Sequence, residues 1–351
     1  MNSLHNNNEF QPLVSIVIPV YNGSNYLAEA IDSALAQTYE HVEVLVVNDG
    51  SNDGGKTRDI ALKYGNKIRY FEKENGGVST ALNHGIREMH GDFFSWLSHD
   101  DLYHQKNIEI QIHNIIKAGD MCVSGCLTSA FKQSPRETNR PISAAKRYIL
   151  SEHLDFWNHW IYACALLIPK SVLKVIGGLN KMNKTAQDDE LVWDILSLTQ
   201  IHLLDCILVF RRSHYEQGMQ NPALLEINLA DGEDLLRRKI SKHGVEYFSG
   251  KDASARKKSY VLFYLSIRFM GDKRRQVWHN YSFFRWLLGL SYKLYPYPWN
   301  PAWLANKTPF GLLFLYINST NNVSRYAGVM KRALLNGLRL SHPLRRSKVK
   351  R

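Results

Sequence analysis

Val14-Ser-Ile-Val-Ile-Pro-Val20 and Val42-Glu-Val-Leu-Val-Val-Asn48 are two short runs rich in β-branched residues, and together they decide the fold. Runs of this kind that end in turn residues are typical of buried strands. Between them, residues 26–37 carry apolar side chains at helical spacing. The pattern predicts a strand–helix–strand unit whose strands lie parallel and are joined by a right-handed crossover.

The same alternation continues along the chain. We expect further helices at 57–64, 78–89, 105–117, 148–159, from 171 and at 186–198, strands at 68–71, 93–97, 121–128 and 201–210, and an apolar run at 161–168. After about residue 225, helical patterns dominate. The sequence therefore predicts an α/β protein with a polar tail at 1–11, an α/β domain at 12–225 and a mainly helical, basic and aromatic C-terminal region at 226–351.

Composition narrows the class of protein. The chain has 351 residues, 44% of them hydrophobic, which fits a globular protein with a substantial core. Its four cysteines lack Cys-x-x-Cys spacing and lie in apolar segments, so we expect buried free thiols and a reducing, cytoplasmic location. The first eleven residues lack the apolar core of a secretory signal. No Gly-x-Gly-x-x-Gly or Walker spacing is present, which argues against a dinucleotide or P-loop fold.

The net charge of +12 is concentrated near the C-terminus. The basic residues there are Lys331, Arg332, Arg339, Arg345, Arg346, Lys348, Lys350 and Arg351. Nucleic acid and anionic lipid both attract such a tail, and a tail that only aids solubility is the simpler alternative. Aromatic clusters at 281–290 and 309–317 are shorter than the about 20 residues that span a bilayer. They fit either an interfacial helix or packing against the α/β domain.

Leu97-Ser-His-Asp-Asp-Leu102 follows an expected strand and places Asp100 and Asp101 at its carboxyl end. Open α/β sheets bind ligands at that edge. Carboxylate oxygens there suit Mg²⁺ or Mn²⁺ bridged to the phosphates of a substrate. The alternative is a solvated turn, because Asp is common where helices begin.

The first two strands bring polar segments to the same edge, Pro19-Val-Tyr-Asn-Gly23 and Asn48-Asp-Gly-Ser-Asn-Asp-Gly54. A carboxylate such as Asp49 can accept hydrogen bonds from a base or ribose, and the small residues after it allow close backbone approach. Glu74-Asn-Gly-Gly-Val-Ser79 opens a helix, whose amides favour an anion. Each segment can also be read as a turn followed by a helix cap.

Gln187-Asp-Asp-Glu-Leu-Val-Trp-Asp194 places four acids at the start of a helix. The first, Asp188, can point toward the sheet edge as a general base, while the later ones project to solvent. The structural alternative is that the acids only complement the helix dipole.

Taken together and in this order, these segments closely resemble family 2 glycosyltransferases with the GT-A fold, over roughly residues 12–217. The resemblance implies a Rossmann-like, mostly parallel mixed sheet flanked by helices. It also implies inverting transfer of a sugar from a nucleotide-sugar to an acceptor hydroxyl, with a divalent metal, Mn²⁺ or Mg²⁺.

The resemblance also implies roles for single residues. Asp188 is the expected catalytic base, and Asp100 the expected metal ligand. Donor-binding residues are Pro19, Tyr21, Asn22, Asp49, Asp53, Asn75, Gly76, Gly77, Asp101, Arg211 and His214. Arg211 and His214 belong, with Arg212 and Gln217, to a segment that resembles the family's Arg-x-His-x-x-Gln, which can approach the diphosphate. Ser98 replaces the first Asp of the family's Asp-x-Asp motif, so the metal has fewer charged ligands.

The leading hypothesis is therefore a bacterial enzyme of surface polysaccharide synthesis, such as O-antigen, capsule or exopolysaccharide. It would use a UDP-sugar donor and a saccharide or lipid-linked saccharide acceptor, in the cytoplasm or on the inner face of the plasma membrane through an anionic surface. Two alternatives remain, a catalytically silent sugar-binding relative and a nucleic-acid-binding protein that uses the basic tail. Nucleic acid is not the expected partner, because the α/β domain lacks a basic–aromatic recognition pattern.

Overall fold

The computed structural model describes residues 11–118, 122–135, 145–151, 161–214, 222–255, 257–258 and 261–262. The chain divides into two compact units, one ending at Leu236 and the other beginning at Arg237. This division falls inside helix α8 (Pro222–His243). The domain boundary near residue 225 stays a prediction, as do all expectations that fall on residues outside the described ranges, including the aromatic clusters and the basic tail.

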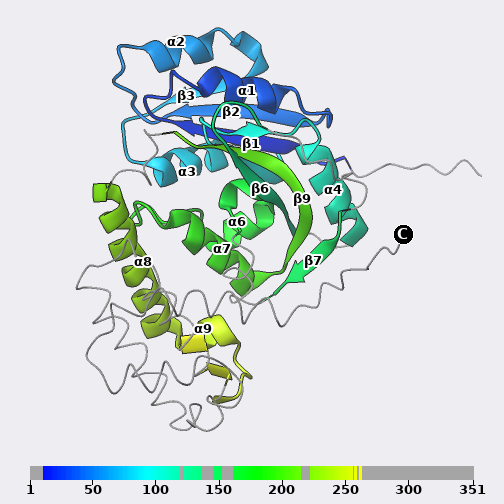
Figure 1. Ribbon diagram of the computed structural model, residues 1–351, viewed down its shortest axis with the longest axis vertical. Helices are drawn as coiled ribbons and strands as arrows, with labels where there is room; N and C mark the ends of the chain where they lie inside the picture. The colour runs from blue at the N-terminus through cyan, green and yellow to red at the C-terminus, as the bar shows by residue number, and fades with distance from the viewer. Residues whose placement is uncertain are drawn as a thin grey trace, which may run out of the picture. The chain divides into compact units, whose positions relative to one another are not determined.

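Nine strands of the described ranges form one sheet in the order β3-β2-β1-β4-β8-β6-β9-β5, and β7 pairs with β9 (Figure 1). They are β1 (Val14–Val20), β2 (Val42–Asn48), β3 (Arg69–Glu72), β4 (Phe93–Trp96), β5 (Leu102–Tyr103), β6 (Val123–Phe131), β7 (Arg147–Leu150), β8 (Leu166–Pro169) and β9 (Ile201–Arg212). The first four strands are parallel, β6 is parallel to β9, and β8, β5 and β7 run antiparallel to their neighbours. The expected mixed α/β sheet is confirmed.

Helices cover both faces of the first four strands. The helices of the described ranges are α1 (Leu27–Leu35), α2 (Lys56–Leu62), α3 (Val78–Glu88), α4 (Asn107–Ala118), α6 (Lys170–Ile176), α7 (Gln187–Leu198), α8, α9 (Glu246–Ser249) and the 3₁₀ turns η1 (Gly65–Lys67) and η3 (Ala163–Ala165). In Figure 1, α1 and α2 lie on one side of β1 and β2, and α3 lies on the other. The buried stripe of α1, which includes Leu27 and Ile31, follows the helical spacing seen in the sequence.

The order of the strands explains why α1 and α2 lie on one face of the sheet and α3 on the other. Strands β2 and β3 add to one side of β1, and β4 adds to the other. With right-handed crossovers, α1 and α2 must then lie on one face and α3 on the opposite face. The loops after β1 and β4 meet at the carboxyl ends of these strands, since a Cβ on Gly23 would lie 2.4 Å from the His99 side chain. We call this region, the edge at which open α/β sheets bind ligands, the crevice. The expected site residues follow these strand ends.

The predicted helix at 148–159 is wrong at its start. Residues Arg147–Leu150 form β7, in which Tyr148 pairs with Leu203 and Leu150 with Ile201 of β9. Hydrogen bonds along the β9 backbone outweigh the local helical pattern here. Residues 152–160 lie outside the described ranges. The two-residue strand β5 is a second element that the sequence did not reveal.

The expectation for the thiols is confirmed, since Cys122, Cys126, Cys164 and Cys206 are all free and buried. Within the part of the chain that the structure describes, no helix has both the length and the apolar composition needed to cross a bilayer.

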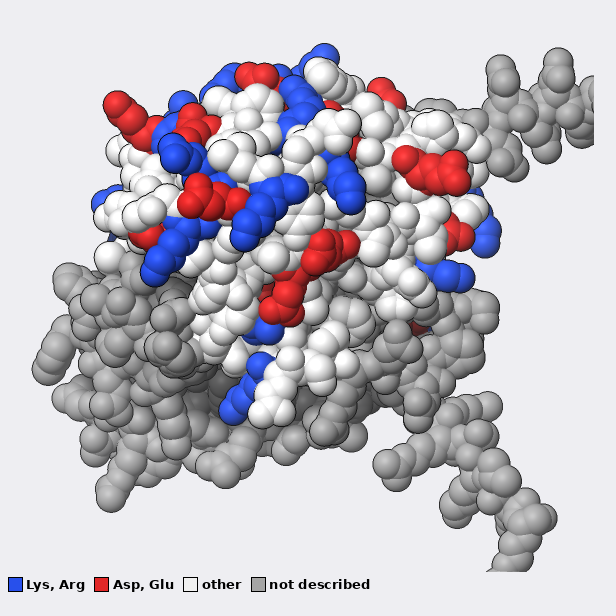
Figure 2. All heavy atoms as spheres, turned by 90° about the horizontal axis from the view of Figure 1, so that it is seen from above, with Lys and Arg blue, Asp and Glu red and all other residues white. Residues whose placement is uncertain are grey.

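Charges of both signs are interspersed on the face seen from above in Figure 2. Lys and Arg side chains there alternate with Asp and Glu side chains, so this face does not present a field of one sign.

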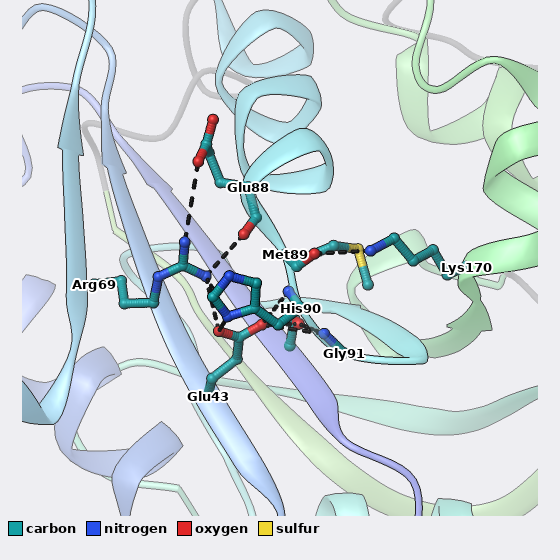
Figure 3. Close-up of polar contacts among 8 residues, drawn as sticks. Glu43, Arg69, Glu88, Met89, His90, Gly91 and Lys170 are labelled. Atoms are coloured by element: carbon teal, nitrogen blue, oxygen red, sulfur yellow. Dashed lines mark hydrogen bonds and ion pairs between the residues drawn. The ribbon is translucent and has the colours of Figure 1, made fainter.

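Glu43 ties together the amino-terminal edge of the sheet, opposite to the crevice (Figure 3). Its Oε1 accepts hydrogen bonds from Ser15 Oγ at 2.5 Å, from the His90 amide at 2.6 Å and from the Gly91 amide at 3.2 Å. Its Oε2 accepts a hydrogen bond from Arg69 at 2.9 Å. Burial alone would raise the pKa of Glu43, but these hydrogen bonds together hold it below its usual value.

The same edge carries the carbonyl groups at the end of α3. Arg69 also donates to the Glu88 carbonyl at 2.8 Å, and Lys170 donates to the Met89 carbonyl at 2.8 Å (Figure 3). Cations at a helix C-terminus satisfy its unpaired carbonyls and complement its dipole.

We expect Glu43→Gln to lower the free energy of unfolding by about 1–3 kcal/mol at neutral pH, because it loses the ion pair and puts an amide donor against backbone donors. The lowered pKa stabilises the fold above the unfolded-state pKa of about 4.3 and ceases to do so as the pH falls through the folded-state value. Urea unfolding at neutral pH and at about pH 3 should therefore show the difference between wild type and variant shrinking in acid.

Glu88→Gln is the matched control. The Glu88 carboxylate is 4.0 Å from Arg69 and 42% exposed, so its removal should change stability by less than about 0.5 kcal/mol. Equal effects of the two variants would contradict the assignment of Glu43.

Candidate active site

The loops after β1 and β2 are joined by asparagine side chains. Asn22, whose φ is 50°, donates its backbone N–H to Ser51 Oγ at 2.8 Å. Its amide group exchanges hydrogen bonds with Asn52, at 2.7 Å and 2.9 Å. Pro19 is buried in β1, and the Tyr21 ring stands 44% exposed beside this loop pair. An exposed aromatic ring at a strand end offers a face on which a base can stack.

Asp49 organises the loop after β3. Its side chain is buried, forms an ion pair with Lys73 and accepts hydrogen bonds from the amides of Gly76 at 3.1 Å and Gly77 at 2.7 Å. Asn75 and the two glycines are exposed. The carboxylate thus holds this loop against the end of β2. Its predicted contact with a nucleoside stays a prediction.

Asp53 also has partners inside the protein. Its Oδ2 accepts hydrogen bonds from the Thr57 amide at 3.0 Å and the Thr57 hydroxyl at 2.7 Å. The buried Thr57 Oγ1 in turn accepts a hydrogen bond from the Gly23 amide at 3.0 Å. Asp53 therefore fixes the beginning of α2 and links it to the loop after β1. Its role toward a donor stays a prediction.

Asp100 and His214 are 114 residues apart in sequence but pair directly, with His214 Nε2 3.0 Å from Asp100 Oδ2. The His214 ring also lies against Tyr26, with ring centroids 4.9 Å apart. Strand β5 explains the approach, because Leu102 pairs with Phe210 of β9. This pairing places the end of the Asp100 loop beside the residues that follow β9.

Arg212 fixes the loop that carries the two aspartates. Its Nε donates to the Asp100 carbonyl at 3.0 Å, and its backbone N–H donates to Asp101 Oδ1 at 2.9 Å. Its guanidinium also reaches Glu29 at 2.7 Å and lies over the Tyr26 ring, 4.3 Å from the centroid. The side chain is only 6% exposed, so these contacts make it a rigid part of the crevice wall.

Asp101 is buried, and this burial together with the charge of Asp100 raises its pKa to about 7. The hydrogen bond from the Arg212 amide and the charges of Arg211 and Arg212 act in the opposite direction. Asp101 therefore faces the interior, while Asp100 reaches the neighbouring histidine.

Arg211 lies apart from this loop. Its Nε donates to Thr128 Oγ1 at 2.9 Å, and its guanidinium lies 3.9 Å from the centroid of the Tyr162 ring. Thus Arg212, rather than Arg211, donates hydrogen bonds to the Asp100 carbonyl and to Asp101. Gln217, which belongs to the same segment in the resemblance, lies outside the described residues.

Asp188 stands in the first turn of α7. Burial raises its pKa above the usual range for a carboxyl group. Burial raises the pKa of the Cys164 thiol as well, with further contributions from the charges of Asp101 and Asp188 and an opposing one from Arg211. The turn η3, which contains Cys164, packs against both α7 and β4, and the Tyr103 hydroxyl donates to the Cys164 carbonyl at 3.4 Å. This turn therefore connects α7 with the strand that precedes the aspartate loop.

The expectation that every acid after Asp188 projects to solvent is wrong for Glu190. Its side chain is buried and accepts hydrogen bonds from Asn180 at 3.1 Å and Asn183 at 3.3 Å. These two amides replace the water that a buried carboxylate needs, so Glu190 anchors α7 to the loop before it.

The cation that the sequence predicts at Asp100 stays a prediction. No group of three or more His, Cys, Asp or Glu able to hold a metal is found among the described residues. The Asp100 carboxylate and the His214 imidazole are two candidate donors, and in this structure they are hydrogen-bonded to each other at 3.0 Å. Ions such as Mg²⁺ commonly complete their shell with phosphate and water.

Lys73 and Tyr162 contact site residues but were not named by the sequence analysis. Lys73 directly precedes the expected loop at 74–79, whereas Tyr162 has no motif around it. Arg212 belongs to the Arg-x-His-x-x-Gln segment of the resemblance, and the structure adds its contacts with the aspartate loop.

Comparisons with known proteins show the family to which the chain belongs. The family model "Glycosyl transferase family 2" matches residues 15–177. A glycosyltransferase of Rickettsia typhi is 38% identical over 283 residues, which cover 76% of this chain and 87% of that protein. The chain thus belongs to glycosyltransferase family 2.

Of two further matches, one covers a smaller share of the relative and the other has a lower sequence identity. A glycosyltransferase of Rickettsia felis is 46% identical over 219 residues, 60% of this chain, but this chain covers only 36% of that protein. The crystal structure of Staphylococcus aureus TarS 1-349 in complex with UDP-GlcNAc has a TM-score of 0.52 at 17% identity, covering 81% of this chain and 91% of that one. That likeness shows the GT-A fold alone.

A substitution at Gly50 tests how closely the loop after β2 must approach the loop after β3. It has a φ of +71°, and a Cβ there would lie 2.6 Å from the Asn75 amide nitrogen. Gly54 has the same φ, with nothing within 4 Å of its would-be Cβ. Gly54→Ala should cost about 1–2 kcal/mol of unfolding free energy from strain alone, and Gly50→Ala at least about 1 kcal/mol more, measured by urea unfolding. Equal costs would show that the close approach is unimportant.

Proposed function

We propose that this chain is an inverting glycosyltransferase that moves a sugar from a nucleotide-sugar to an acceptor hydroxyl. The observation that carries the proposal is the pairing of Asp100 with His214 beside the buried Asp101, at the carboxyl ends of the strands. A UDP-sugar is the proposed donor, supported by the fold shared with TarS, whose structure holds UDP-GlcNAc. The donor, the acceptor and the inversion of the sugar are all parts of this proposal.

The proposed donor contacts divide between two sets of residues. Tyr21, Asn22 and the exposed loop at Asn75 receive the nucleoside, held in place by Asp49 and Asp53. Asp100 and His214 hold Mn²⁺ or Mg²⁺. The metal neutralises charge that develops on the leaving diphosphate. Asp101, Arg211 and Arg212 lie on the side of the proposed site that receives the sugar.

Asp188 is the proposed catalytic base. Its carboxylate takes the proton of the acceptor hydroxyl as that oxygen forms a bond to the anomeric carbon, while the bond to the diphosphate oxygen breaks on the opposite face. Attack from the opposite face inverts the anomeric centre. A carboxylate whose pKa is raised by burial is a stronger base than an exposed one, which suits this role.

The proposed acceptor is a saccharide, free or lipid-linked, of a bacterial surface polysaccharide. The basic and aromatic composition of the C-terminal region supports a membrane-proximal acceptor at an anionic surface on the cytoplasmic side. No described feature favours nucleic acid.

The first experiment measures nucleotide release and sugar transfer across UDP-, dTDP- and GDP-sugars, with saccharides and lipid-linked saccharides in anionic vesicles. Each reaction is run with Mn²⁺, Mg²⁺ or a chelator. We expect one donor class to be used in a metal-dependent way. Asp188→Asn should lower kcat by about 100-fold or more, and Asp100→Ala should remove the response to metal.

Asp189→Asn is the matched control for the base, because it removes a neighbouring carboxylate that lies about 100° around the same helix. Its kcat should stay close to that of wild type. Donor binding without turnover under every condition would instead identify a silent sugar-binding relative. Turnover that is indifferent to the chelator would remove the proposed role of Asp100.

The pH dependence of kcat tests Asp188 separately. The base must be ionised, so kcat should fall as the pH falls through its raised pKa, at a higher pH than the about 3.9 of an exposed aspartate. The residual activity of Asp188→Asn should lack this acid limb. An unchanged limb in that variant would assign it to another group.

A further inference from the structure

Asp231, on α8, holds the segment that leads into the helix of the proposed base. Its Oδ2 accepts hydrogen bonds from the Lys184 amide at 3.0 Å, from the Thr185 amide at 2.9 Å and from Thr185 Oγ1 at 2.9 Å. Asn228, one turn earlier on α8, donates its side-chain N–H to the Thr185 carbonyl at 3.0 Å. Both polar groups of the Thr185 backbone are thus bound to α8.

The bound segment lies directly before α7. Thr185 precedes Asp188 by three residues, and α7 begins at Gln187. The N-cap residue of α7 is Ala186, whose side chain cannot cap the helix. The start of α7 therefore depends on contacts from neighbouring residues.

Two sets of contacts fix that start. Asn183 accepts a hydrogen bond from the Ala186 amide at 2.9 Å and donates to Glu190 on α7 itself. These bonds shape the turn but move together with it. Asp231 and Asn228 bind the turn to a different helix, α8, so they restrain the turn from outside itself.

We propose that Asp231 is a positioning residue, which holds the first turn of α7 so that Asp188 meets the acceptor hydroxyl. The inference rests on the proposed function. Asp231 touches neither donor nor acceptor in this scheme. It lies beyond residues 15–177, which match the family model, so the proposal concerns a part of this chain that the model does not cover.

A positioning role predicts a specific kinetic signature. General-base catalysis depends on hydrogen-bond geometry, and a displacement of about 1 Å can cost about 100-fold in rate. Asp231→Ala should therefore lower kcat by about 10- to 100-fold. The KM for the donor should change little, because the nucleoside loops lie on other elements. The acid limb of kcat should also move to lower pH, since a loosened turn admits water to Asp188.

The experiment uses the full chain and compares Asp231→Ala with Asp231→Asn, which keeps an acceptor oxygen in place without the charge. Asp231→Asn should restore most of kcat. Asp234→Asn changes an exposed carboxylate three residues further along α8 and is the matched control, with kcat near that of wild type. Hydrogen exchange of the Lys184 and Thr185 amides measures the contact without any substrate, and it should speed up in Asp231→Ala but not in Asp234→Asn.

The outcomes separate this inference from the proposed function. If wild type is active and Asp188→Asn is not, an Asp231→Ala protein with faster exchange but unchanged kcat and acid limb overturns the positioning role alone. Unchanged exchange overturns it as well, and so does an Asp231→Asn protein as impaired as Asp231→Ala. Absence of turnover in wild type with every donor and acceptor overturns the proposed function first, and the positioning role with it.

Thr185→Val guards against a variant that fails to fold. It removes only the hydroxyl donor to Asp231 and keeps a β-branched side chain of similar size. If thermal unfolding shows that Asp231→Ala is not folded, Thr185→Val should still lower kcat by a few-fold with an unchanged donor KM. A wild-type kcat in this variant would then overturn the proposal.

Discussion

The buried Arg212 guanidinium is the interaction on which the rest of the crevice depends. It connects the end of β9 with the Asp100 carbonyl and with Glu29 of α1, while its own backbone N–H holds Asp101. A buried cation needs partners for its donors, and here the partners come from two segments distant in the sequence. The aspartate loop, the first helix and the segment around His214 are therefore fixed in one arrangement.

A second set of contacts holds the loops after β1, β2 and β3 together. The Asp49 carboxylate binds Lys73 and two loop amides, and the paired asparagines join the loops after β1 and β2. The hydrogen-bond partners of each carboxylate thus separate those that hold loops and helices in place from those proposed to act on a substrate. Asp49 accepts hydrogen bonds at both carboxylate oxygens, and Asp53 and Glu190 each accept two at one oxygen. The Asp100 carboxylate instead pairs with the His214 imidazole, and burial raises the pKa of Asp188.

Helix α8, outside the sheet, also holds a segment of the proposed active site in place. Its Asp231 reaches the turn before α7, so the position of the proposed base is set by residues about forty-five positions later in the chain. Because α8 contains the division between the two compact units, the helix that supports α7 also continues into the second unit. The active-site geometry thus involves more of the chain than the strand ends alone.

The sequence by itself determined the order of the first strands and helices, because β-branched runs and helical spacing are local properties of the chain. It also placed the polar segments at the strand ends, since parallel strands joined by right-handed crossovers leave their carboxyl ends on one edge. It could not reveal β7 or β5, which form by pairing with the distant β9. The preference for Arg212 over Arg211, the pairing of Asp100 with His214 and the support of α7 by Asp231 were decided only by the tertiary structure. Each of these is a contact between side chains or backbone groups from elements far apart in the chain, and no local spacing encodes such a distance.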